Sequence, residues 1–220
     1  MHLNTYIDHT LLKPTASKNE IIKLCDEAIA YEFFSVCVNS CYVSLAKQHL
    51  KNTKVKVCSV IGFPLGAMST QAKVNEAKKA LDDGADEIDM VMNLGYLKSQ
   101  DFDNVWKDIE AVKRIMPFNT LKVILETCYL EEDEILKASE LAIKGGADFI
   151  KTSTGFGTRG ASFDDIKLMK RVAKDITKIK ASGGIKDAKT AIDYINLGVQ
   201  RLGTSSGIAI LKGSISKSNY

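Results

Sequence analysis

The chain has 220 residues, of which 45% are hydrophobic and 26% are charged, a balance typical of a globular protein with one sizeable core. Its 30 basic and 27 acidic residues leave a net charge of +3, which excludes the strongly basic surface of a protein that binds nucleic acid or anionic membranes. Five cysteines without a framework spacing predict reduced thiols in a cytoplasmic protein. The most apolar segment, residues 59–68, is broken by glycine and proline, so no membrane span is expected.

Short runs rich in β-branched residues alternate along the chain with segments that have helical spacing of apolar residues. The eight runs are YIDHTLL (6–12), FFSVCVN (33–39), VKVCSVIGF (55–63), EIDMVMN (87–93), LKVILET (121–127), FIKTST (149–154), KIKASGG (178–184) and RLGTSSG (201–207). The helical segments include 19–32, 70–84, 103–116, 133–146 and 187–198. This alternation predicts an α/β fold, a (β/α)8 TIM barrel formed by a single domain, 1–220, with a mobile tail at about 213–220. An open doubly wound sheet is the alternative.

Three junctions between a helix and the next strand share one pattern. GADEID begins at 84, GADFIK at 146 and GVQRLG at 198, and each glycine is expected to end its helix in the left-handed conformation. Five residues after each glycine come Asp89, Lys151 and Gly203, and Cys37 has the same register in EFFSVC. Equal offsets place these residues at one depth of the barrel, facing its interior.

A second repeat, IKTSTG at 150 and IKASGG at 179, predicts that Lys151 and Lys180 lie side by side on consecutive strands. Two ammonium groups in a semi-enclosed site disfavour each other's charge, so at least one is expected to lose its proton easily. A neutral lysine can attack a carbonyl to form a Schiff base. Phosphate binding, or contact of both lysines with solvent, is the alternative.

Asp89 is expected in the same layer as the two lysines. It could neutralise a lysine, or it could move protons between a substrate and water with Lys180 as its partner. Asp8, in the first strand, is a second inward carboxylate with a supporting role. Cys37 and Cys41 have no histidine or second cysteine pair near them in the sequence, so we expect no metal and no cofactor.

Glycine loops follow the last three strands. In a barrel, the loops after strands seven and eight often bind phosphate through backbone N–H groups. The residues predicted to bind phosphate here are Gly155, Gly183, Gly184, Ser205 and Ser206. The alternative is that these glycines only form tight turns.

The ordered motifs YIDHTLLKP, SVCVN, VIGFPLGA, GADEIDMVMNLG, DFIKTSTGFG, KASGGI and RLGTSSG cover nearly the whole chain. Together they resemble the deoxyribose-phosphate aldolase family. The resemblance implies a class I aldolase that reversibly cleaves 2-deoxy-D-ribose 5-phosphate to D-glyceraldehyde 3-phosphate and acetaldehyde without a metal. It also implies that its partners are small phosphosugar and aldehyde substrates, with no nucleic acid and no membrane. A homodimer is the expected assembly.

The same resemblance implies roles for individual residues. Lys151 would form the Schiff base. Lys180 would lower the pKa of Lys151 and relay protons, and Asp89 would donate and accept protons. Tyr220, in the terminal SKSNY, would assist proton transfer, and Cys37 would lie near the carbonyl in the substrate pocket.

Two residues depart from the family pattern. Arg159 stands where a small residue is expected, and Phe156 stands where some members have a lysine near the phosphate.

Two other functions remain open at this point. One is a non-catalytic barrel that binds a phosphorylated metabolite, and the other is a transaldolase or a different Schiff-base aldolase. The lysine pair with Asp89 favours catalysis, because burying these charges costs stability that a binding protein has no need to lose.

Overall fold

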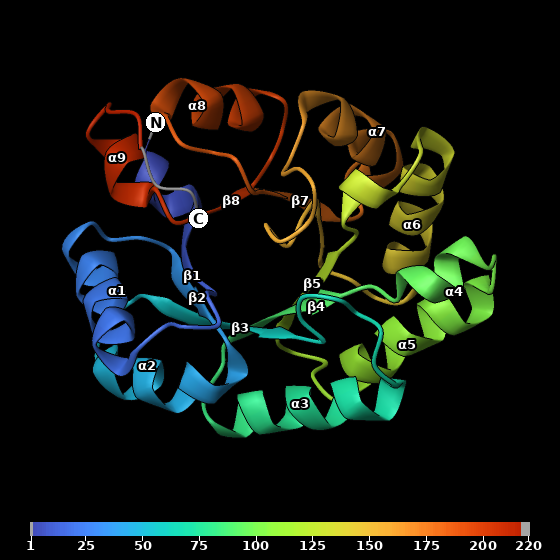
Figure 1. Cartoon of the computed structure of the whole chain (residues 1–220), viewed down its shortest axis with the longest axis horizontal. Coiled ribbons are helices and arrows are strands. Elements are labelled where there is room, and N and C mark those ends of the chain that lie inside the picture. The colour runs from blue at the N-terminus through green and yellow to red at the C-terminus, as the bar shows by residue number, and fades with distance from the viewer. Residues whose placement is uncertain (1, 217–220) are drawn as a thin grey trace.

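The computed structural model describes residues 2–216, which form a barrel of parallel strands surrounded by helices (Figure 1). The strands are β1 (Ile7–Leu11), β2 (Ser35–Val38), β3 (Lys56–Ile61), β4 (Glu87–Val91), β5 (Thr120–Ile124), β6 (Phe149–Lys151), β7 (Lys178–Ser182) and β8 (Arg201–Thr204). They pair in chain order, and β8 closes the barrel on β1. The predicted (β/α)8 barrel is therefore confirmed, and the open doubly wound sheet is wrong. The expected tail beyond residue 216 lies outside the described residues.

The helices cover the outside of the barrel (Figure 1). They are α1 (Lys18–Ala30), α2 (Val43–His49), α3 (Thr70–Asp82), α4 (Leu94–Lys98), α5 (Phe102–Arg114), α6 (Glu132–Lys144), α7 (Phe163–Ala173), α8 (Ala188–Asn196) and α9 (Gly207–Leu211), with 3-10 turns η1 (Leu3–Tyr6), η2 (Ser40–Tyr42) and η3 (Thr127–Tyr129). Each of the five helical segments that the periodicity indicates coincides with one of these helices. None of the helices within residues 2–216 is both long and apolar enough to cross a membrane.

Local sequence explains where the helices begin and end. Ser17 starts α1 with a capping box, because its side chain accepts from the backbone of Glu20, whose carboxylate accepts from the backbone of Ser17. Asp187 caps α8 in a similar way, by accepting from the backbone of Thr190. Gly84 and Gly146, which follow α3 and α6, have φ values of 103° and 90°, as expected for glycines that end helices.

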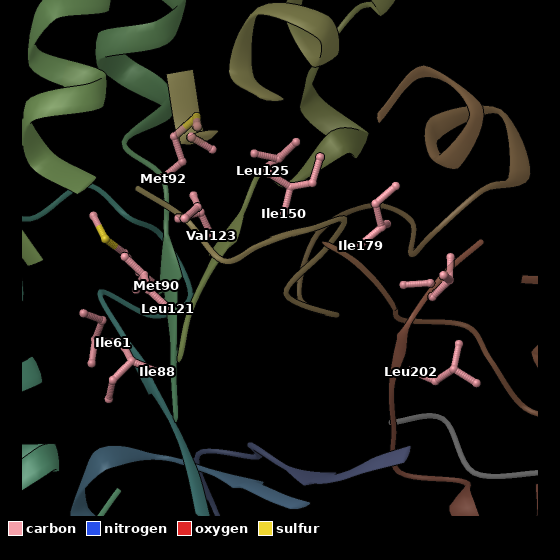
Figure 2. Close-up of a cluster of buried hydrophobic side chains, with 14 of the residues drawn as sticks. Ile61, Ile88, Met90, Met92, Leu121, Val123, Leu125, Ile150, Ile179 and Leu202 are labelled. Atoms are coloured by element: carbon pink, nitrogen blue, oxygen red, sulfur yellow. The ribbon is translucent and has the colours of Figure 1, made fainter. Parts of the chain in front are cut away.

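The strands separate an apolar outer layer from a polar interior. Figure 2 shows outward side chains of one core cluster: Ile88, Met90, Leu121, Val123, Ile150, Ile179 and Leu202 are all buried beneath the helices. Since side chains alternate along a strand, the residues between them face inward. Several of these inward residues are charged, and they place the candidate site at the centre of the barrel.

Candidate active site

Lys151 and Lys180 are paired residues of β6 and β7, as the repeated Ile-Lys-x-Ser-x-Gly order predicts. Both side chains point into the barrel, where Lys151 is 3% exposed and Lys180 is fully buried. Lys151 lines a cavity, whereas Lys180 lies below it. The two lysines therefore differ in access, and of the two only Lys151 can be reached from that cavity.

Asp89, on β4, lies between the two lysines. Its Oδ2 atom accepts a hydrogen bond of 2.8 Å from Lys151 Nζ and another of 2.8 Å from Lys180 Nζ. Its Oδ1 atom accepts from Lys122 Nζ at 2.7 Å. Burial opposes ionisation of Asp89, but the three lysines that donate to its carboxylate, Lys122, Lys151 and Lys180, outweigh this effect and hold the pKa of Asp89 well below its usual value. Asp89 is thus a carboxylate that can accept a proton only transiently.

Lys180 also contacts Asp8 of β1, with Nζ 2.5 Å from Asp8 Oδ2. Burial opposes the positive charge of Lys180, but Asp8 and Asp89 outweigh that effect and raise its pKa. The sequence prediction that one of the lysines loses its proton easily therefore does not apply to Lys180, which stays charged between two carboxylates. Gly203 makes room for this lysine, because a Cβ atom there would lie 3.0 Å from Lys180 Cε.

Three further charged residues in the barrel were not singled out from the sequence. Lys122 of β5 contacts Glu87 as well as Asp89, and Arg201 of β8 contacts both Glu87 and Asp8. All three are buried. The signal that could have revealed Lys122 is the same as for Lys151, a lysine inside an apolar strand, but β5 lacks the preceding glycine that indicated the register of β4, β6 and β8.

Cys37 lies deeper than the sequence prediction of a pocket residue suggests. It is fully buried, is paired in register with Cys58, and is absent from the residues that line the cavity. Burial raises the pKa of Cys58, whereas a hydrogen bond from Cys58 lowers that of Cys37. The ligand atoms of Cys37, Cys58 and Asp89 lie within 4.8 Å of one another. Lys122 Nζ, however, is 3.3 Å from Cys58 Sγ and 2.7 Å from Asp89 Oδ1, so two of these three groups already contact a cation, and its charge opposes entry of a metal ion.

The cavity above Lys151 has a volume of about 590 Å³. It opens at the carboxyl ends of the strands, where active sites of (β/α)8 barrels lie. Its lining includes Lys151 and all five residues predicted to bind phosphate: Gly155, Gly183, Gly184, Ser205 and Ser206.

The loops around the cavity differ in the state of their backbone donors. The N–H groups of Gly183, Gly184 and Ser205 have no acceptor among residues 2–216, whereas the N–H of Ser206 donates to Thr204 Oγ1 at 2.9 Å. Gly184 has a φ of 78° and open space where a Cβ would stand. The cavity therefore presents a cluster of free N–H donors that suits an anion.

Arg159 and Phe156 stabilise the loop between β6 and α7. The guanidinium of Arg159 contacts Asp165 at 2.5 Å and 3.0 Å, so its charge is directed at α7. The ring of Phe156 packs edge-on against Phe63, with centroids 5.3 Å apart. Both departures from the family pattern thus have packing roles in this loop. Tyr220 lies outside the described residues.

Comparisons with known proteins agree with this architecture. A family model described as the DeoC/LacD family aldolase matches residues 3–215. A deoxyribose-phosphate aldolase of Finegoldia magna is 57% identical over 213 residues, which are 97% of this chain and 100% of that protein.

Two solved structures are similar over most of their length. One, QR15, an aldolase, has a TM-score of 0.92 and 48% identity, and the match covers 96% of this chain and 94% of that one. The other is a tetrameric deoxyribose phosphate aldolase of Aeropyrum pernix, with a TM-score of 0.89 and 31% identity, and covers 96% of this chain and 89% of that one.

Proposed function

Because the chain belongs to the DeoC/LacD family of aldolases, we propose that it reversibly cleaves 2-deoxy-D-ribose 5-phosphate to D-glyceraldehyde 3-phosphate and acetaldehyde through a Schiff base on Lys151. The observation that carries the assignment is the position of Lys151. Of the three buried lysines around Asp89, Lys151 is the one that lines the cavity, and it donates a hydrogen bond to Asp89. An amine in this position can meet a substrate carbonyl while Asp89 and Lys180 remain below it.

In the proposed reaction, the neutral amine of Lys151 adds to the C1 aldehyde of the open-chain sugar, and loss of water gives an iminium ion. Removal of the proton from the C3 hydroxyl breaks the C2–C3 bond. The electron pair moves to C2 to form an enamine, and C3 becomes the aldehyde of glyceraldehyde 3-phosphate. Protonation of C2 and hydrolysis of the imine then release acetaldehyde and restore the lysine.

Asp89 and Lys180 are suited to the proton transfers of this cycle. Asp89 Oδ2 is 2.8 Å from both lysine nitrogens, so a proton released during imine formation has an acceptor next to it. The raised pKa of Lys180 keeps a donor available beside the same oxygen. Water in the cavity would connect this pair with the hydroxyl group and C2 of the substrate.

The phosphate is proposed to bind at the glycine loops. The free N–H groups of Gly183, Gly184 and Ser205 supply donors, and Gly155, whose φ is 90°, lines the same cavity from the loop after β6. Ser206 would contribute its hydroxyl rather than its N–H, which already donates to Thr204. Phosphate held at this edge directs the carbonyl end of the sugar toward Lys151.

Reductive trapping tests the nucleophile. Acetaldehyde and borohydride should convert Lys151 to its N-ethyl derivative, which peptide mass mapping locates. Lys151→Ala should fold, lose turnover and lose the label, whereas Lys178→Ala, at an exposed position of the same sheet, should keep both. A label found only on surface lysines would reject the assignment.

We propose that the chain forms a homodimer and is located in the cytoplasm, as expected from the sequence. Light scattering after size-exclusion chromatography measures the assembly directly, and it also distinguishes a dimer from the tetramer named for the Aeropyrum pernix structure.

A further inference from the structure

Six charged side chains below the cavity form a closed ring of alternating sign, referred to here as the buried ring. Its members in order of contact are Asp89, Lys122, Glu87, Arg201, Asp8 and Lys180, and Lys180 returns to Asp89. The distances are 2.7 Å from Lys122 to Asp89 Oδ1, 2.7 Å from Lys122 to Glu87 and 2.8 Å from Arg201 to Glu87. Each carboxylate in the ring contacts two of its cations.

The buried ring is electrically balanced without Lys151. Three carboxylates face three cations within it, so the ring carries no net charge. In the part of the chain that the structure describes, Lys151 joins the ring through one ionic contact, to the Asp89 oxygen that Lys180 already uses. A proton on Lys151 would therefore leave the interior with one uncompensated positive charge, which is costly in a buried site.

The other titratable groups near Lys151 do not supply the missing negative charge. In the interior these are the thiols Cys37 and Cys58. Burial raises the pKa of Cys58, and although a hydrogen bond from Cys58 lowers the pKa of Cys37, the burial of Cys37 and the charge of Asp89 both oppose its ionisation. Above the strands, the carboxylate of Glu126 accepts from the backbone and hydroxyl of Thr154. The remaining charged groups of the cavity lining are cationic, namely Arg159 and Lys186.

We propose that Glu87, Lys122 and Arg201, none of which lines the cavity, are positioning residues that keep Lys151 uncharged by completing a neutral ring around Asp89. The inference rests on the imine chemistry proposed above. It assigns to the ring a second task, to aim Asp89 Oδ2 at Lys151, because Lys122 holds the other oxygen. Arg201 is itself fixed from two sides, since its guanidinium lies 3.4 Å from the ring centroid of Phe34 and 6.0 Å from that of Phe149.

The proposal predicts opposite effects for opposite charges. Arg201→Gln removes a positive charge, so Lys151 should keep its proton to higher pH. Lys151, Lys180 and Arg201 are in register on successive strands, which separates Arg201 from Lys151 by about 10 Å and gives an expected upward shift of about one pH unit. Glu87→Gln removes a negative charge and should shift the same transition downward.

The experiment measures the rate of ethylation of Lys151 by acetaldehyde and cyanoborohydride as a function of pH, because this rate follows the neutral amine and does not require the full catalytic cycle. The pH midpoint should rise in Arg201→Gln, fall in Glu87→Gln and return close to that of the wild type in the double variant. Arg201→Lys, which keeps the charge, should move the midpoint less than Arg201→Gln.

Circular dichroism and thermal unfolding establish that each variant is folded. If Arg201→Gln does not fold, Lys122→Gln can replace it, because this variant also removes one positive charge from the buried ring. Glu87→Gln still tests the predicted downward shift. Midpoints that stay at the wild-type value, or that move in one direction in both single variants, would overturn the proposal. If Lys151 of the wild-type protein is not ethylated at all, the proposed function fails instead, so the two failures are distinguishable.

Discussion

Lys151 and Lys180 are paired across neighbouring strands and donate to the same oxygen, Asp89 Oδ2, at 2.8 Å each. The sequence repeat suggests two adjacent ammonium groups that repel each other directly. In the structure, a carboxylate oxygen accepts hydrogen bonds from both of them. Lys180 has a second carboxylate, Asp8, whereas Asp89 is the one carboxylate within residues 2–216 that Lys151 contacts, and Lys151 shares it. This asymmetry distinguishes the proposed nucleophile from its neighbour.

Replacing Lys180 by leucine removes a positive charge next to Asp89. Lys151 should then retain its proton to higher pH, and turnover at neutral pH should fall but partly recover in alkali. If Lys180 acts mainly as a proton donor, activity stays low at every pH. A pH-rate profile separates the two roles, with Lys178→Leu on the same strand as a control, and a profile like that of the wild type would show that Lys180 has neither role.

Gly184→Asp should raise KM for 2-deoxyribose 5-phosphate strongly, because a carboxylate would face the proposed phosphate position. Gly184→Asn is the matched control. Both side chains tolerate a positive φ, so both variants carry similar backbone strain while only one adds charge. Steady-state kinetics should show a larger effect of Asp than of Asn on the phosphate ester, and no such difference with unphosphorylated deoxyribose. Equal KM values for the two variants would contradict a phosphate site at this loop.

Asp108→Asn tests a buried ion pair outside the barrel. Lys73 Nζ lies 2.6 Å from Asp108 Oδ2, and both side chains are buried between α3 and α5. Removing the carboxylate leaves the buried ammonium without its partner, and should lower the free energy of unfolding by about 3–5 kcal/mol. Glu110→Gln breaks the exposed pair with Arg114 on α5 and should cost only about 0–1 kcal/mol. Urea denaturation measures both free energies of unfolding. Similar losses would show that burial does not increase the effect of breaking the pair between Lys73 and Asp108.

The buried ring also predicts how stability depends on pH. The pKa values of Asp8 and Asp89 are lowered by folding, so their contribution is present above their unfolded value, about 3.9, and is lost as pH falls through the folded values. The pKa values of Lys122 and Lys180 are raised, so their contribution is present below about 10.4 and is lost as pH rises through the folded values.

Urea midpoints measured from acid to alkaline pH should therefore show a plateau between these limits. Asp89→Asn should be less stable than the wild type at neutral pH but should lose less stability on acidification. An acid slope as steep as that of the wild type would indicate that other carboxylates dominate acid unfolding.

Much of the architecture could be predicted from local patterns. The alternation of strand and helix signals gave the barrel, and the glycine before β6 together with the Ile-Lys-x-Ser-x-Gly repeat placed Lys151 beside Lys180. These signals are local, since each depends on periodicity or on a fixed offset from a helix end. They are therefore readable without knowing how the barrel closes.

The buried ring could not be predicted in this way. Arg201 and Glu87 are 114 positions apart in the chain and contact each other across the barrel, a relationship that depends on side-chain length and barrel closure and leaves no local pattern. The depth of Cys37 was missed for a similar reason. Its register was read correctly, but Cys37 is buried in a cluster with Leu12, Cys58 and Val60, which come from other segments and share no local pattern with it.

The rigid separation between Lys151 and the glycine loops sets a length that a substrate must match. Lys151 lies on β6, and Gly184 and Ser206 follow β7 and β8, so the span between the amine and the proposed phosphate position is fixed by strands hydrogen-bonded to one another. A flexible lid could adjust to a shorter or longer sugar, but a closed barrel cannot. Under the proposed assignment, the barrel therefore selects substrates by the number of carbon atoms between the carbonyl and the phosphate, before any bond is made.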